Sequence, residues 1–258
     1  MKTNLSKISR LALCAFALAP ALSQPLAAQS PESTEPMGQK FANPKLAKTL
    51  RVLLVGSGSS HDFPKYFLGS DEVTLKAAGG MDVAATPNLE EALALLPEAD
   101  VLVFSGNHDQ YGKEEFQKAL NDFADKRKGL VFLHAATWDH SAWKGYNDRF
   151  INGKTPNHGK GDFEVTVKDT KSPLMKGVPA TFKIYDENYH FEPGPKAKYD
   201  ICAENAPDGG PDPHASVWTV KDRKTRIVCI TLGHDDKAHD NPAYKAILTN
   251  SVNWVAGR

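Results

Sequence analysis

The chain has 258 residues, of which 41% are hydrophobic, and it carries 31 Lys and Arg against 31 Asp and Glu. That length is sufficient for one sizeable domain with its own core, and we find no internal repeat that would divide it. Because the sequence has neither an excess of positive charge nor a basic stripe, binding to nucleic acid is not expected.

The first 29 residues have the pattern of a secretory signal peptide. Lys2, Lys7 and Arg10 form a basic start, and an apolar run over residues 11–22 follows it. Small residues around Ala28 predict cleavage near that position. The apolar run is shorter than the roughly 20 residues of a membrane span, so we expect a periplasmic or secreted protein with no membrane attachment after cleavage.

The remaining chain divides into a short leader and one domain. Residues 30–45, rich in Pro, Ser, Glu and Gln, predict a flexible leader, and residues 46–258 predict a single domain. Cleavage of the signal peptide removes three cations and no anion, which leaves 28 against 31 and a net charge of −3. The sequence leaves a monomer and a homo-oligomer both open.

The first half of the domain alternates short apolar runs with helical segments. We expect strands over residues 51–56, 81–85, 100–105 and 129–133. Helices are expected to begin at Asp62-Phe63-Pro64, to span residues 89–96 after an Asn88 cap, and to span residues 113–126. Alternation of this kind builds a parallel sheet with helices on both of its faces.

The second half reads as strands joined mostly by turns. The expected strands are residues 163–168, 181–185, 198–203, 216–220 and 226–232, with a hairpin tip at 222–224 and a closing helix from Asn241-Pro242. We therefore predict an α/β fold, doubly wound and flavodoxin-like, whose mostly parallel sheet has an antiparallel extension in the C-terminal half.

Two cysteines remain after signal cleavage, Cys202 and Cys229, and both lie in expected strands. An exported protein can form a disulfide, which requires the two strands to be neighbours. The alternative is a pair of buried thiols that act as small apolar residues.

Histidines and carboxylates follow four of the apolar runs, as His61-Asp62, His134, Asp186-Glu187 and His234-Asp235. Ligands of parallel sheets collect at the carboxyl ends of the strands, so one polar site is expected there. His158 lies in a loop that gives it no packing role, and we place it in the same site. The alternatives are a structural histidine at position 134 and ordinary solvated charges around Glu187.

Three imidazoles and one carboxylate suit a divalent cation of the zinc, manganese or iron type. The predicted metal ligands are His134, His158, Glu187 and His234, although no HExxH or CxxC spacing is present. We expect His134, Glu187 and His234 to be catalytic. A metal-free site, in which Glu187 and a histidine exchange protons with the substrate, is the alternative.

Paired acids beside aromatic rings suit a sugar, because hydroxyl groups bind carboxylates and ring faces pack on aromatic side chains. We expect the substrate to be bound by His61, Asp62, Trp138, Asp186, Tyr189 and Asp235. The glycine- and serine-rich residues 56–60 lack the ending of a P-loop and the GxGxxG pattern, so no nucleotide is expected.

The same motifs, in this order and spacing, resemble the ThuA-like, trehalose-utilisation family over residues 49–257. They are His61-Asp62-Phe63, the run 129–136 around His134, Asp186-Glu187-x-Tyr189, residues 231–235 and Asn241-Pro242. The resemblance implies a fold similar to class I glutamine amidotransferases. The nucleophilic cysteine of those enzymes has no counterpart at residues 134–136, so this chain is not expected to hydrolyse glutamine.

The resemblance also implies a role in the catabolism of trehalose and related glucosides, beside oxidoreductases that make 3-keto sugars. We therefore expect an exported sugar-processing enzyme, a hydrolase, lyase or isomerase that acts on a trehalose-like glucoside or its 3-keto derivative. The alternative is a periplasmic carbohydrate-binding protein without turnover.

Overall fold

The computed structural model describes residues 40–42, 48–107, 109–138, 140, 143–206 and 213–258. These residues belong to one compact unit, Met37–Arg258. The predicted signal peptide and most of the predicted leader lie outside the described residues. Among the helices that are described, none has the length and apolar character needed to cross a membrane.

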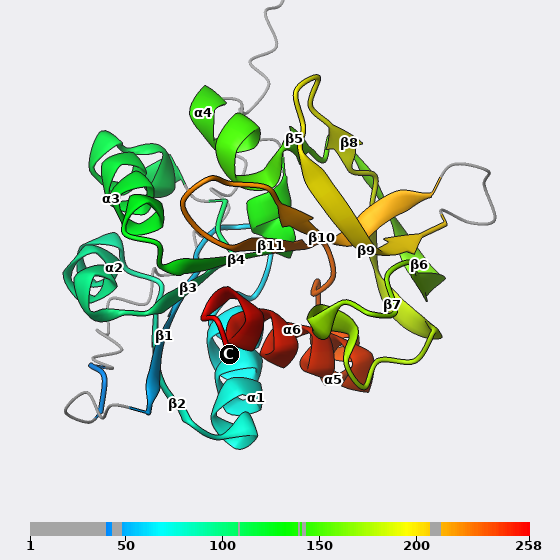
Figure 1. Ribbon diagram of the computed structural model, residues 1–258, viewed down its shortest axis with the longest axis horizontal. Coiled ribbons are helices and arrows are strands. Elements are labelled where there is room, and N and C mark those ends of the chain that lie inside the picture. Colours follow the sequence, from blue (N-terminus) through cyan, green and yellow to red (C-terminus); the bar gives the residue numbers. More distant parts are fainter. Residues whose placement is uncertain (1–39, 43–47, 108, 139, 141–142, 207–212) are drawn as a thin grey trace, which may run out of the picture. The chain divides into compact units, whose positions relative to one another are not determined.

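The described strands form a nine-stranded sheet in the order β2-β1-β3-β4-β11-β10-β9-β6-β7 (Figure 1). Their bounds are β1 Leu50–Val55, β2 Met81–Thr86, β3 Val101–Phe104, β4 Gly129–Leu133, β6 His158–Val167, β7 Thr181–Tyr189, β9 Tyr199–Asn205, β10 His214–Val220 and β11 Ile227–Ile230. The strands from β2 to β11 are parallel, and β10, β9, β6 and β7 pair antiparallel. A separate small ribbon pairs β5 Gly153–Lys154 with β8 Glu192–Pro193. The predicted α/β fold with an antiparallel extension is confirmed.

Helices cover both faces of the sheet. They are α1 Asp71–Ala78, α2 Leu89–Leu95, α3 Glu114–Asp125, α4 Lys144–Tyr146, α5 Asp236–Asp240 and α6 Pro242–Val255, with π-helical turns at Tyr66–Ser70 and Asn147–Ile151 and short 3-10 turns at Leu96–Glu98, Asp109–Gly112, His134–Thr137 and Pro173–Met175. Figure 1 shows α1, α5 and α6 together on one side of the sheet. Side chains of α1 and α6 form one core with the sheet, and those of α2 and α3 form a second core.

Strand β4 shows how the sequence produces this arrangement. All five of its residues are buried. Val131 and Leu133 belong to the core under α6, whereas Leu130 and Phe132 belong to the core under α3, because successive side chains of a strand point to opposite faces. A strand covered on both sides is therefore apolar at every position, and this continuous apolar run is what the sequence predicted.

Helices α2 and α6 begin at the residues predicted from the sequence. The Asn88 side chain accepts hydrogen bonds from the backbone N–H groups of Glu90 and Glu91, at 2.8 and 3.1 Å. The Asn241 side chain accepts one from Ala243 N at 2.9 Å. The predicted Asn88 cap and the predicted helix start at Asn241-Pro242 are confirmed, and each side chain satisfies backbone donors that the first helical turn leaves free. The predicted start at Asp62 was wrong, because residues 63–65 form a turn, Tyr66–Ser70 form a π-helical turn, and α1 begins at Asp71.

The predicted ends of two strands were wrong. Strand β7 continues through Asp186 and Glu187 to Tyr189, and β6 begins already at His158. The two extensions pair with each other, with His158 opposite Tyr189 and Lys160 opposite Glu187. The extensions consist mostly of polar residues and of the glycines at 159 and 161. They therefore lack the hydrophobic periodicity from which strands are predicted.

Cys202 and Cys229 are free, buried thiols. Strand β10 lies between their strands, β9 and β11, and the two side chains belong to different cores. Two strand spacings amount to about 9.6 Å, which exceeds the limit of about 7 Å between Cα atoms for a disulfide. The alternative of two core thiols is therefore the correct one.

Candidate functional site

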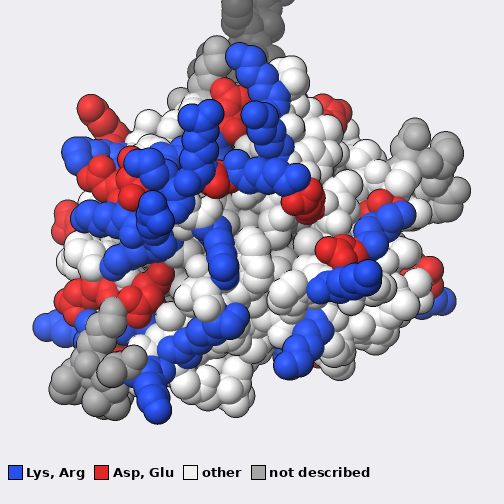
Figure 2. All heavy atoms as spheres, viewed as in Figure 1, with Lys and Arg blue, Asp and Glu red and all other residues white. Residues whose placement is uncertain are grey.

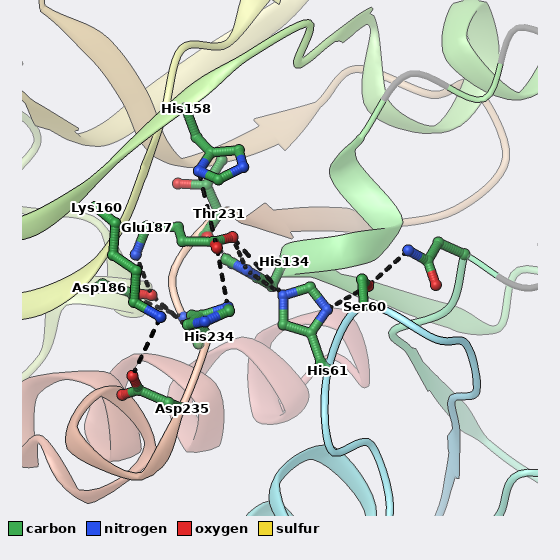
Figure 3. Close-up of polar contacts among 12 residues, drawn as sticks. Ser60, His61, His134, His158, Lys160, Asp186, Glu187, Thr231, His234 and Asp235 are labelled. Atoms are coloured by element: carbon green, nitrogen blue, oxygen red, sulfur yellow. Dashed lines mark hydrogen bonds and ion pairs between the residues drawn. The ribbon is translucent and has the colours of Figure 1, made fainter. Parts of the chain in front are cut away.

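Four side chains from distant parts of the chain converge at the carboxyl ends of the central strands (Figure 3). They are His61 from the loop after β1, His134 at the end of β4, Glu187 from β7 and His234 from the loop after β11. One potential ligand atom from each lies within 4.8 Å of the others. Three imidazoles and a carboxylate in such proximity form a group that can hold a metal ion.

Four separations between atoms of these residues are compatible with a shared ion. Nε2 of His134 lies 3.0 Å from Nε2 of His61 and 3.3 Å from Oε2 of Glu187. The His61 nitrogen lies 3.7 Å from the same Glu187 oxygen, and Nδ1 of His234 lies 3.3 Å from Glu187 Oε1. Two atoms bound about 2.1 Å from one ion at tetrahedral angles are about 3.4 Å apart, in the middle of these values.

His134 is completely buried, and its position fixes its tautomer. Nδ1 lies 2.5 Å from the carbonyl oxygen of Thr231, which only accepts hydrogen bonds, so Nδ1 carries the proton. Burial lowers the pKa of His134 to about 3, against the opposing effect of Glu187, so the imidazole is neutral near pH 7. Its Nε2 lone pair then points at His61 and Glu187, as a metal ligand requires.

The backbone at His134 has a φ of +40°, a region that non-glycine residues seldom adopt. The 3-10 turn His134–Thr137 begins directly at this residue. This sharp turn from strand into helix places the imidazole in the site, and unfavourable backbone geometry of this kind concentrates at functional positions.

His61 is held by a short polar relay that the sequence analysis did not identify. Oγ of Ser60 lies 2.6 Å from His61 Nδ1, and Nδ2 of Asn107 donates to the same hydroxyl at 2.6 Å. The rings of Phe63 and Phe67 pack edge-on against the imidazole. The position of Ser60 next to His61 was visible in the sequence, but nothing there indicated the contact with Asn107, 47 residues away.

Glu187 is ionised within this cluster. Burial alone would raise its pKa, but interactions with His134, His234 and His61 outweigh burial and lower the pKa well below its usual range. Among the described residues, Nδ1 of His234 is buried and makes no hydrogen bond of acceptable geometry. Glu187 has no Lys or Arg partner among the described contacts, and a bound cation would supply a counter-charge for this buried carboxylate.

Asp186 supports the site from the other side of β7. Its carboxylate accepts hydrogen bonds from the backbone N–H groups of Gly233, His234 and Glu187, at 2.7, 2.9 and 2.8 Å. Burial raises the pKa of Asp186 to about 7, and the three N–H donors oppose that change. Asp186 therefore fixes the loop that carries His234 rather than contacting the converging ligand atoms.

The other predicted site residues lie around the cluster. The Tyr189 ring packs against His134 at a tilt of 32°, with ring centroids 4.3 Å apart. The ring of half-buried Trp138 lies 5.4 Å from that of Tyr189 and 5.6 Å from that of His158. His158 is 35% exposed, with Nδ1 3.8 Å from Glu187, and it is not among the four clustered groups, where His61 stands instead. The two remaining residues form turns: Asp62 accepts from Lys65 N at 3.1 Å, and Asp235 accepts from Lys237 N at 3.1 Å and lies 3.8 Å from Lys160.

A buried ion pair lies behind the His234 loop. His239 places Nδ1 2.7 Å from the Asp71 carboxylate and Nε2 3.0 Å from the Gly233 carbonyl oxygen, so both of its nitrogens face acceptors. Burial opposes the charge on His239, but Asp71 and the two hydrogen bonds raise its pKa. His239 is 1% exposed, so the pair lies within the core.

The His239–Asp71 pair predicts a pH dependence of stability. Because the pKa of His239 is raised by folding, its stabilising effect is complete below about pH 6.5, the pKa of an unfolded histidine, and is lost as pH rises through the folded value. Urea unfolding at about pH 6 and about pH 9 should show a lower free energy of unfolding at the higher pH. The variant His239→Gln should show a smaller decrease in the free energy of unfolding between these two pH values, with the remainder due to Asp186, whose pKa is also raised. The variant His214→Gln should show the full decrease, and equal decreases in the two variants would contradict the assignment.

Fold and site together define a flavodoxin-like α/β protein with a histidine–carboxylate cluster at the carboxyl ends of its strands. The profile of the ThuA family, described as trehalose utilisation, matches residues 51–255. The chain therefore belongs to the ThuA family, and the expected membership is confirmed.

Solved structures agree with this fold. A ThuA-like protein from Parabacteroides merdae superposes with a TM-score of 0.70 at 19% identity, over 81% of this chain and 90% of that one. A ThuA-like protein from Bacteroides uniformis gives 0.68 at 17% identity, over 84% and 95%. The cytoplasmic protein STM3548 from Salmonella typhimurium gives 0.57 at 11% identity, over 80% and 99%. A comparison with curated protein sequences found no match.

Proposed function

We propose that this ThuA family protein is an exported, metal-dependent enzyme that processes a trehalose-like glucoside or its 3-keto derivative. The observation that carries the proposal is the convergence of His61, His134, Glu187 and His234 within 4.8 Å of one another. Membership of a family described as trehalose utilisation supports a sugar substrate.

The residues present fit a divalent cation of the zinc, manganese or iron type. Neutral imidazoles and one ionised carboxylate are the donors that such ions take, and the Thr231 carbonyl oxygen holds the second nitrogen of His134 as outer partners of metal ligands do. When bound, the ion would polarise a sugar carbonyl or lower the pKa of a water molecule.

The chain's own groups supply positioning and proton transfer. Tyr189 and Trp138 present aromatic surface beside the cluster, where the apolar face of a sugar ring can pack. His158 is the exposed imidazole nearest to Glu187, so it can exchange a proton with a sugar hydroxyl or with the carbon beside a ketone. The buried His134 stays neutral and keeps its lone pair directed at the site.

The experiment is elemental analysis of the purified protein together with turnover of trehalose and 3-ketotrehalose, before and after treatment with a chelator. We expect about one equivalent of metal and an activity that chelation removes and metal restores. Sugar binding measured by calorimetry without turnover, and unaffected by the chelator, would instead favour the carbohydrate-binding protein.

The location of the protein is tested separately. The basic and apolar residues at the start of the chain predict export with cleavage near Ala28, so mass spectrometry of the native protein should find a start at Gln29 or Ser30. An intact Met1 in the cytoplasmic fraction would refute export without affecting the metal site.

A further inference from the structure

Two adjoining hollows lie at the opposite end of the sheet from the metal-ligand cluster. They have volumes of about 320 and 360 Å³, and both are lined by Arg127, Val255 and Ala256. The first extends over the β10–β11 turn at Arg223 and Lys224, and the second extends towards Arg258 at the end of the chain. Figure 2, in the same view as Figure 1, shows Lys and Arg side chains gathered around this turn and the end of α3.

The acidic residues around these hollows already have partners. Asp222 and Asp125 both pair with Arg149, at 3.5 and 2.6 Å, and Asp100 accepts from the backbone of Arg51. Lys224 contributes to lowering the pKa of Asp125, after the larger effect of Arg149. Six cations line the two hollows against two carboxylates, so positive charge is in excess there; the cations are Arg127, Lys128, Arg223, Lys224, Arg226 and Arg258, and the carboxylates are Asp100 and Asp222.

Helix ends account for some of these cations but not for all of them. Arg226 donates to the carbonyl oxygen of Trp254 at 2.7 Å, and Arg258 donates to those of Gly80 and Lys48, at 3.2 and 2.8 Å. These bonds serve carbonyl groups that the C-terminus of α6 and neighbouring turns leave free. Within the described part of the chain, the guanidinium groups of Arg127 and Arg223 have no such acceptor and no ion-pair partner.

We propose that this pair of hollows, here called the basic groove, binds a small ligand that carries two linked phosphate groups. Arg127 lines both hollows, so a phosphate in either hollow could contact its guanidinium. Arg223 and Lys224 would contact the phosphate in the first hollow. A guanidinium group can donate two parallel hydrogen bonds to two oxygens of one phosphate. Cations that lie close together repel one another, and a bound anion relieves that repulsion. The cations come from three separate turns, so the sequence shows no basic stripe.

The test is isothermal titration of the full mature protein with inorganic pyrophosphate and with inorganic phosphate. We expect one pyrophosphate per chain, bound about 10-fold more tightly than phosphate because both hollows are used. The variants Arg127→Gly and Arg223→Ala should each weaken pyrophosphate binding by about 10-fold. Arg127 has a φ of +63°, a conformation that glycine adopts readily, so Arg127→Gly removes the charge without straining the backbone.

Lys113→Ala is the matched control. It removes an exposed cation at the other end of α3, about 18 Å along the helix, and should leave pyrophosphate binding unchanged. Absence of saturable pyrophosphate binding, or equal weakening by Lys113→Ala, would overturn the proposal. Because no metal ligand lies in the basic groove, this result is independent of whether the proposed enzyme function holds.

A second measurement identifies the source of the phosphate groups. Co-sedimentation with vesicles that contain cardiolipin, whose headgroup carries two phosphate groups joined by glycerol, would assign the basic groove to a lipid headgroup if pyrophosphate competes it away and Arg127→Gly abolishes it. Pyrophosphate binding without co-sedimentation would assign it to a free phosphorylated compound. Vesicle binding that pyrophosphate does not compete away would place the lipid contact elsewhere and would count against the groove.

Discussion

Replacing His134 by alanine is expected to remove the bound metal and abolish activity. His134 contributes a lone pair oriented by the Thr231 carbonyl oxygen, and its Nε2 lies 3.0 Å from His61 and 3.3 Å from Glu187. Loss of outer partners alone costs metal affinity by roughly 10- to 100-fold, so loss of a ligand should cost more than about 100-fold. Competition with a chromogenic chelator measures this affinity directly.

Two further variants make the result for His134 interpretable. Glu187→Gln retains the size of the side chain while removing its charge, so it should also lose metal, with a circular dichroism spectrum like that of the wild type. His158→Ala should retain the metal, because His158 lies outside the four clustered groups. Metal loss in His158→Ala would instead favour the ligand set predicted from the sequence, in which His158 takes the place of His61.

Replacing Asp186 by alanine is expected to lower the free energy of unfolding by about 3 kcal/mol and to reduce metal affinity. The substitution leaves three buried N–H groups without an acceptor, and each such group costs about 1–3 kcal/mol. Asp186→Asn should cost less, because its carbonyl oxygen still accepts while its amide opposes one donor. Urea unfolding measures the free energy of unfolding. Competition with the chromogenic chelator measures the metal affinity, which should fall because the His234 loop is no longer held in place.

Asn188 provides the matched control for Asp186. It lies two residues further along the same strand and on the same face, is 4% exposed, and its side-chain oxygen has no hydrogen-bond partner among the described residues. Asn188→Ala should therefore cost less than Asp186→Ala and leave metal affinity unchanged. Equal losses of stability and metal affinity in both variants would mean that truncating any side chain on this face of β7 has the same effect. The loss in Asp186→Ala would then not come from the His234 loop.

The fold could be predicted because its central strands are buried on both sides. A strand such as β4 must be apolar throughout, and the helix caps at Asn88 and Asn241 are local signals that need no tertiary information. The hairpin formed by His158 and Tyr189 could not be predicted in the same way. Apart from Tyr185 and Tyr189, its paired residues are polar or glycine, so the hydrophobic pattern that marks the other strands is missing there.

Only the site residues that directly follow neighbouring strands could be predicted from the sequence. His134 and His234 follow strands that are neighbours in the sheet, so the rule that polar residues gather at carboxyl ends placed them together. The rule does not say which further imidazole reaches Glu187, and His61 rather than His158 lies in the cluster. Likewise, the pairing of His239 with Asp71 joins residues 168 positions apart, and no pattern in the sequence records such a contact.

The position of β11 determines when the site can form during synthesis. This strand, Ile227–Ile230, lies between β4 and β10, and Thr231, which binds His134, follows it 97 residues after that histidine. Until the ribosome has made β11, one side of β4 is an open edge that can pair with another chain. A nascent chain therefore carries His134 before Thr231 and His234 exist, and the site is completed only when β11 inserts.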